Sequence, residues 1–147
     1  MTNRILSIVA AAFLASPAIA QDHSSWVVDD TFDNVSFSVE SAILDKGLTI
    51  DSVSHVGEML ERTREDIGSD VTLYTDGIVF SFCSASVSRT AMEADIMNIA
   101  FCPDGIFVFS TPENPDKTTV GHRFMGGDSM AEVNALLDAI IADAITY

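Results

Sequence analysis

Two cysteines, Cys83 and Cys102, carry the most evident chemistry in this sequence. Two thiols in one chain can join as a disulfide, act as redox groups, or bind a soft metal ion. We expect either a Cys83–Cys102 disulfide or two separate buried thiols, and the residues alone leave both open. A C-x-x-C spacing is absent, so a thioredoxin-like activity has little support.

Whether the two thiols meet depends on the elements that carry them. Cys83 ends one predicted strand and Cys102 opens another, with a predicted helix between them. A helix of ~12 residues extends about 18 Å, whereas a disulfide needs Cα atoms within roughly 7 Å. A helix that returns the chain fully would place the cysteines at opposite ends. A short or crossing helix would bring both to one edge.

A metal-binding alternative adds His122 to the two cysteines, because thiolates and imidazole suit a soft metal ion. Cys102 and His122 are expected on neighbouring strands. His23, His55 and His122 are widely separated, so no pair at i+3 or i+4 spacing indicates a local metal site. We therefore expect no cofactor, and the other interpretation of His122 is a solvent-facing strand residue.

Arg123 is a candidate ligand contact because the chain has only seven lysines and arginines. Its planar guanidinium can bind a carboxylate ligand, or it can pair with one of the 22 acidic residues. Carboxylates are too numerous to single out a catalytic pair. The G-x-S-x-G, P-loop, Rossmann and H-E-x-x-H patterns are absent. No catalytic residue is predicted.

The elements that must position these residues form one domain of mixed helices and strands. The expected order is β-α-β-α-β-α-β-β-α, in which the hairpin strands at 71–74 and 78–82 count as one β element. Strands are expected at 26–32, 48–53, 71–74, 78–82, 99–110 (interrupted at 103–105) and 118–124, and helices at 33–46, 57–67, 84–98 and 130–144. The first helix has Asp33 or Asn34 as its expected cap, and the third has Ser84 or Ser86.

Two local signals are specific enough to predict connections. Asp76-Gly77 lies between apolar runs, which indicates a hairpin. Ser129 and Glu132 have the spacing of a capping box, followed by a wide apolar stripe that must pack against a sheet.

Residues 78–82 and 106–109 are apolar on both faces of their strands. Phe80 points to one face of the sheet and Val79 to the other. Phe107 and Phe109 likewise point to the face opposite that of Ile106 and Val108. A sheet with helices on one side alone should alternate to polar on its second face. A homodimer or a ligand would explain the second apolar face, and cover by local helices and loops is the alternative.

The order of several short stretches resembles domain of unknown function family 302. They are residues 32–47, Phe82-Cys83, Cys102-Pro103-x-x-Ile106 and Val120-Gly121-His122-Arg123, within roughly residues 26–145. The resemblance implies a single compact α+β domain, with a curved, mostly antiparallel sheet backed by helices, and a homodimer. It implies no established activity. Family members usually have an aromatic residue after Cys-Pro, and this chain has Asp104.

The first 20 residues are predicted to be a signal peptide cleaved near Ala20. Arg4 precedes an apolar run, and Ala18-Ile19-Ala20 forms a small-x-small site. We therefore expect one domain over residues 21–147, located in the periplasm or secreted. The formal net charge of −15 becomes about −16 without Arg4. Such a charge repels nucleic acid and anionic membranes, so we expect neither as a partner.

These observations favour a non-catalytic, exported domain that binds a small ligand or a protein partner. The alternative is a thiol redox or metal-handling protein that uses Cys83 and Cys102. An enzyme with an acid and a base from distant carboxylates also stays open.

Overall fold

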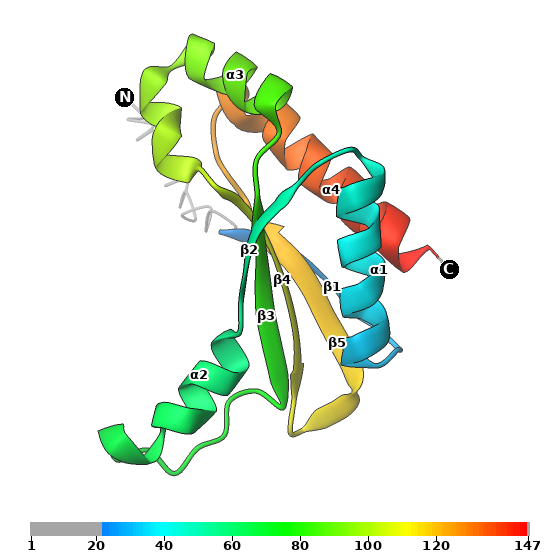
Figure 1. The fold of residues 1–147 in the computed structure, drawn as a ribbon, viewed down its shortest axis with the longest axis vertical. Helices are drawn as coiled ribbons and strands as arrows, with labels where there is room; N and C mark the ends of the chain where they lie inside the picture. The colour runs from blue at the N-terminus through cyan, green and yellow to red at the C-terminus, as the bar shows by residue number, and fades with distance from the viewer. Residues whose placement is uncertain (1–21, 147) are drawn as a thin grey trace, which may run out of the picture.

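The computed structural model describes residues 22–146, which form a five-stranded sheet and the helices that pack on it (Figure 1). The predicted signal peptide, residues 1–20, lies outside this part of the chain. The strands are β1 (His23–Val28), β2 (Ile50–Ser54), β3 (Asp76–Phe82), β4 (Asp104–Thr111) and β5 (Asn114–Arg123). The α-helices are α1 (Phe32–Asp45), α2 (Val56–Thr63), α3 (Ala85–Ala94) and α4 (Ala131–Ile145). Short 3-10 helices are η1 (Glu65–Ile67), η2 (Ile96–Phe101) and η3 (Asp128–Met130).

The sheet has the strand order β1-β5-β4-β3-β2, and every neighbouring pair is antiparallel. The order of elements along the chain is the predicted β-α-β-α-β-α-β-β-α. The α+β class and the antiparallel sheet are therefore confirmed. Among the described residues, none of the helices is both long and apolar enough to cross a bilayer.

The hydrophobic core lies between one face of the sheet and the helices α1 and α4, which pack against each other on that side (Figure 1). Ile106 and Val108 of β4 are completely buried, and so are Leu137 and Ile141 of α4. Burial of each such side chain contributes about 1.5–3 kcal/mol. The apolar stripe predicted for the last helix is therefore buried against the sheet, as its spacing requires.

Side-chain caps begin two of the α-helices. Thr31 caps α1, because its Oγ1 accepts a hydrogen bond of 3.4 Å from the backbone N–H of Asn34. The predicted caps, Asp33 and Asn34, instead lie inside the first turn. Ser84 caps α3 through a 3.4 Å bond from the N–H of Val87, as one of the two alternatives predicted.

The predicted capping box of α4 is wrong. The helix begins at Ala131 after the 3-10 turn η3, and no side chain caps it. Ser129 Oγ instead accepts a 3.1 Å hydrogen bond from the side-chain amide of Asn98, a buried residue of η2. A tertiary contact therefore uses the hydroxyl that a local cap would need.

The hairpin predicted at Asp76-Gly77 is also wrong. These residues are the first two of β3, and residues 71–74 form no strand. The reason is topological: β2 and β4 occupy both edges of β3, which leaves no free edge for another strand. The only hairpin of adjacent strands in the described part is β4–β5, where Thr111 pairs with Asn114.

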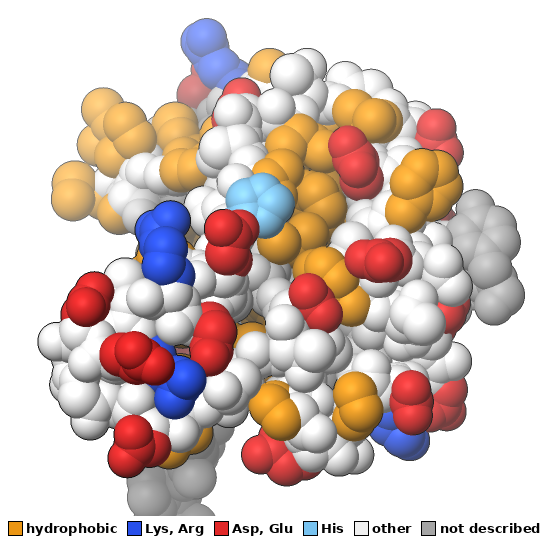
Figure 2. All heavy atoms as spheres, turned by 60° about the horizontal axis from the view of Figure 1, so that its bottom comes forward, with side chains coloured by type: hydrophobic (Ala, Val, Ile, Leu, Met, Phe, Trp, Pro, Cys, Tyr) orange, Lys and Arg blue, Asp and Glu red, His pale blue; other side chains and the backbone are white. Residues whose placement is uncertain are grey.

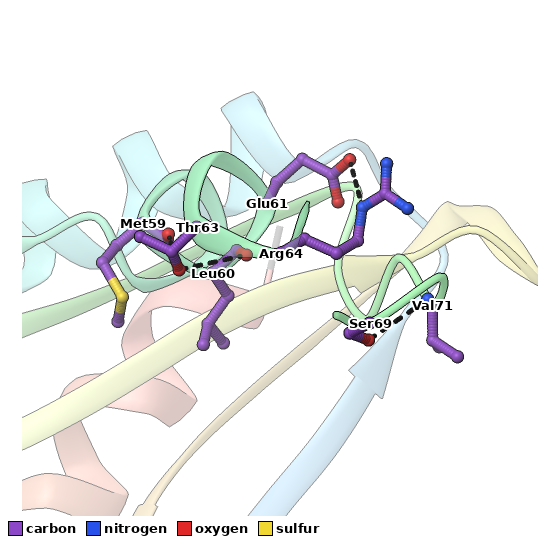
Figure 3. Close-up of polar contacts among 7 residues, drawn as sticks. All are labelled: Met59, Leu60, Glu61, Thr63, Arg64, Ser69 and Val71. Atoms are coloured by element: carbon purple, nitrogen blue, oxygen red, sulfur yellow. Dashed lines mark hydrogen bonds and ion pairs between the residues drawn. The ribbon is translucent and has the colours of Figure 1, made fainter. Parts of the chain in front are cut away.

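The helix α2 approaches β3 through two glycines. A Cβ on Gly57 would lie 2.7 Å from the backbone nitrogen of Gly77, so only glycine permits this contact. Local polar contacts hold the rest of α2 and the segment that follows it, up to Val71 (Figure 3). Arg64 Nε lies 3.1 Å from Glu61 Oε1, and Thr63 Oγ1 donates to the Met59 carbonyl at 2.9 Å.

Candidate ligand-binding site

The sheet face opposite α1 and α4, which we call the open face, carries half-buried aromatic side chains. Val79, Phe107 and Phe109 alternate with core residues and point to this side, which confirms that both faces of β3 and β4 are apolar. The Phe107 and Phe109 rings stack with centroids 6.0 Å apart, and Tyr74 meets Phe109 edge-on at 5.3 Å. Helix α2 covers only part of this face.

An apolar hollow of about 380 Å³ lies on the open face. The Tyr74, Phe107 and Phe109 rings line it, with Val56 from the start of α2. Cavities of a few hundred Å³ with mostly apolar walls are typical of small-molecule sites. The hollow can accept a flat or branched hydrocarbon group.

A second, more polar hollow of about 410 Å³ adjoins the first, and the two share His23, Val79 and Phe107 in their walls. Its polar walls include Asp104 and Arg123. The two hollows together provide an apolar compartment next to a charged one. Such an arrangement suits a ligand that is itself apolar at one end and polar at the other.

Asp104 is the most perturbed acid of the site. It begins β4, is only 3% exposed, and its Oδ2 has no hydrogen-bond partner among the described residues. Burial raises the pKa of this carboxyl to about 6, against a smaller lowering by nearby His122. A buried, shifted carboxyl in a hollow is a common property of functional sites. Asp104 therefore changes charge near neutral pH.

Arg123 is the cation of the site. It ends β5 with an exposed side chain on the open face and pairs in register with His23 of β1. Within residues 22–146, Arg62 and Arg123 are the only lysine or arginine side chains without an ion pair. The alternative that Arg123 pairs with an acid is therefore not observed in this part of the chain. Its guanidinium is available to an anionic group in the polar hollow.

The two cysteines lie beside each other at one end of the sheet. Phe82 pairs with Asp104 in the last register position of β3 and β4, so Cys83 and Cys102 flank this pair. Both are free thiols, and Cys102 lies near enough to raise the pKa of the Cys83 thiol. The chain between them returns through a short helix and a 3-10 turn, which is the geometry that brings both to one edge.

His122 is completely buried, so the solvent-facing interpretation is wrong. Its Nδ1 hydrogen-bonds to the backbone carbonyl of Arg123, and its Nε2 to Asp138 Oδ1, both at 2.8 Å. Both ring nitrogens are thus engaged away from the thiols. Within the described residues, no three His, Cys, Asp or Glu side chains gather as metal ligands. The structure does not bring His122, Cys83 and Cys102 together.

Asn134 of α4 holds Met125, one of the residues that line the polar hollow. Its Oδ1 accepts from the backbone N–H of Met125 at 3.0 Å, and its Nδ2 donates to the Met125 carbonyl at 2.6 Å. Met125 and Leu137 both line the hollow. The chain after β5 is therefore held against α4, two residues beyond Arg123.

Sequence reasoning predicted Arg123 and the second apolar face, but it did not identify Asp104 as a site residue. In the sequence, Asp104 was notable only because similar proteins have an aromatic residue at that position. Burial of one acid among 22 has no signature in the sequence. The surface confirms this abundance, since acidic side chains are spread over the face seen in Figure 2 with hydrophobic side chains between them.

No protein-family model matches this sequence, and no curated protein matches it. The fold is similar to a solved structure, the crystal structure of the uncharacterized conserved protein DUF302 from Bacillus stearothermophilus. The TM-score is 0.63 at 15% sequence identity, and the match covers 86% of this chain and 97% of that one. The resemblance predicted from the sequence is thereby confirmed at the level of the fold: this chain has the fold of a protein of domain of unknown function family 302.

Proposed function

We propose that this domain binds a small carboxylate with an apolar body on the open face of its sheet. The single observation that carries the proposal is the position of Arg123, a cation without an ion pair among the described residues, next to an apolar hollow. The hydrocarbon part would lie against Phe107 and Phe109, and the carboxylate would meet the guanidinium.

The energetic contributions of the two compartments differ. Burial of an apolar group stabilises the complex by about 25 cal/mol per Å² of surface removed from water. The Tyr74, Phe107 and Phe109 rings provide this apolar surface. They already pack against one another, so they need not rearrange to receive the ligand. A charge-assisted hydrogen bond to arginine adds about 1.5–3 kcal/mol. Arg123 is exposed and the chain is strongly acidic, so we expect its contribution at the lower end.

We further propose that the domain acts outside the cytoplasm, after removal of residues 1–20. The support is the sequence of that segment, with Arg4, an apolar run and Ala18-Ile19-Ala20. The predicted homodimer stays a prediction. If it formed through the open face, it would exclude the ligand proposed here.

Binding of a panel of small carboxylates tests the proposal. Calorimetric titration with 3-phenylpropanoate, indole-3-acetate and 4-methylpentanoate should give saturable binding for at least one of them. The Arg123→Gln variant should bind that compound about tenfold more weakly, which corresponds to about 1.4 kcal/mol. Arg62→Gln is the matched control, because Arg62 also lacks an ion pair but lies outside both hollows.

The alcohol that corresponds to the bound acid separates the two compartments. It should bind the wild type and Arg123→Gln equally, since it presents no charge to position 123. The proposal fails if no carboxylate binds saturably, or if Arg123→Gln and Arg62→Gln weaken binding to the same extent.

A further inference from the structure

The antiparallel register of β3 and β4 brings the two cysteines together. Phe82 of β3 pairs with Asp104 of β4, and the next residue after Phe82 is Cys83. Cys102 precedes Asp104 by two residues, so it lies at the same end of the two strands. Both are free thiols, and Cys102 lies close enough to raise the pKa of the Cys83 thiol.

The surroundings of the two thiols differ. Cys83 is exposed at the surface, whereas Cys102 is half-buried. The backbone of Asp104 lowers the pKa of the Cys83 thiol. Partial desolvation still raises the pKa of the Cys83 thiol, and Cys102 and Asp104 raise it further. An outside reagent therefore reaches Cys83 first, and it meets a thiol that ionises with difficulty at neutral pH.

We propose that Cys83 and Cys102 form a dithiol site that exchanges with small disulfides and closes into an internal disulfide. This inference does not depend on the proposed ligand. The co-reactant is a low-molecular-weight disulfide of the glutathione type, and the product is a covalent bridge between the end of β3 and the start of β4.

The exchange proceeds in two balanced steps. The Cys83 thiolate attacks one sulfur of oxidised glutathione, the glutathione S–S bond breaks, and one glutathione thiolate leaves and takes a proton. The Cys102 thiolate then attacks the Cys83 sulfur of the mixed disulfide and expels the second glutathione thiolate. The two protein thiols lose two electrons and two protons, and the glutathione disulfide becomes two thiols.

The bridge would close a ring of ~20 residues that contains α3 and η2. It would also border the polar hollow, because Pro103 and Asp104 follow Cys102 directly and line that hollow. Oxidation should therefore restrict the unfolded chain and fix one wall of the hollow.

Intact-mass measurement after incubation with excess oxidised glutathione tests the proposal. The wild type should lose two alkylatable thiols while gaining neither a glutathione adduct nor a covalent partner chain. Cys83→Ser and Cys102→Ser should each stop at one stable glutathione adduct, since neither has a second thiol to complete the exchange. The adduct should form faster in Cys102→Ser, which keeps the exposed Cys83, and its rate should rise about tenfold per pH unit near neutral pH.

A second readout uses stability. The oxidised wild type should melt at least about 5 °C above the reduced form, and the two serine variants should show no such difference. The proposal is overturned if both thiols stay reduced in excess oxidised glutathione. It is equally overturned if the wild type accumulates two glutathione adducts or a disulfide-linked dimer.

Discussion

Replacing Asp104 with asparagine should remove a pH-dependent loss of stability of about 2.5 kcal/mol between pH 4 and pH 8. The wild-type carboxyl has a pKa of about 6 in the folded chain, raised from 3.8 by burial. Asparagine keeps the shape of the side chain and does not ionise. The difference in unfolding free energy, variant minus wild type, should therefore increase with pH across this range.

The sign follows from proton binding. Below the unfolded pKa, Asp104 is protonated in both states and adds no penalty. Between the two pKa values the unfolded chain releases its proton while the folded chain keeps it, so the wild type loses stability as pH rises. Above the folded pKa the carboxylate is charged and buried with Oδ2 unpartnered, and the full loss is present.

Urea denaturation at pH 4, 6 and 8 measures this difference. Asp116→Asn is the matched control, because Asp116 is an exposed acid near the β4–β5 turn. The control difference should change by under about 0.5 kcal/mol over the same range, as is usual for surface substitutions. A constant difference between Asp104→Asn and the wild type at all three pH values would contradict the burial of an ionisable Asp104.

Replacing Gly121 with alanine should destabilise the fold by about 3 kcal/mol or more. Gly121 is buried in β5, between the edge strand β1 and the ring of Phe107. A Cβ there would collide with the backbone carbonyl of Ser24 and would lie 2.5 Å from the Phe107 ring. The Ser24 carbonyl belongs to the paired backbone of β1 and cannot turn away as a side chain can.

Two measurements check the Gly121→Ala result. Urea denaturation should show the lower stability, and amide exchange should show loss of protection in β1, which pairs only with β5. Gly126→Ala is the control, since a Cβ at Gly126 meets nothing within 4 Å. If both variants were equally stable, the close packing of β1, β5 and Phe107 would be wrong.

The α+β class and the element order were predictable because each element has a strong local signal. The apolar stripe of α4 and the doubly apolar strands β3 and β4 dictate how the layers must stack. Local patterns failed where tertiary contacts compete for the same group. Ser129 bonds to Asn98 rather than capping a helix, and β3 has no edge left for the predicted hairpin partner.

The site was predictable only in part. Arg123 stood out because basic residues are few, and Phe107 and Phe109 stood out by alternation. The burial of Asp104 and His122 could not be predicted from the sequence, since it depends on how the chain after β5 packs against α4. Whether the two cysteines lie at the same end of the sheet depended on the length and path of one connection, so the sequence left both arrangements open.

The central claim, that the open face binds a small carboxylate, is tested most directly by mapping the bound probe. Titration of the ¹⁵N-labelled chain with 3-phenylpropanoate, indole-3-acetate and 4-methylpentanoate in turn should give, for at least one of them, saturable amide shifts centred on Phe107, Phe109 and Arg123. The groove between α1 and α4 near Phe37 and Asp143, a hollow of about 650 Å³, should stay unaffected. Saturable shifts centred on that groove, or no saturable shift on the open face, would contradict the account.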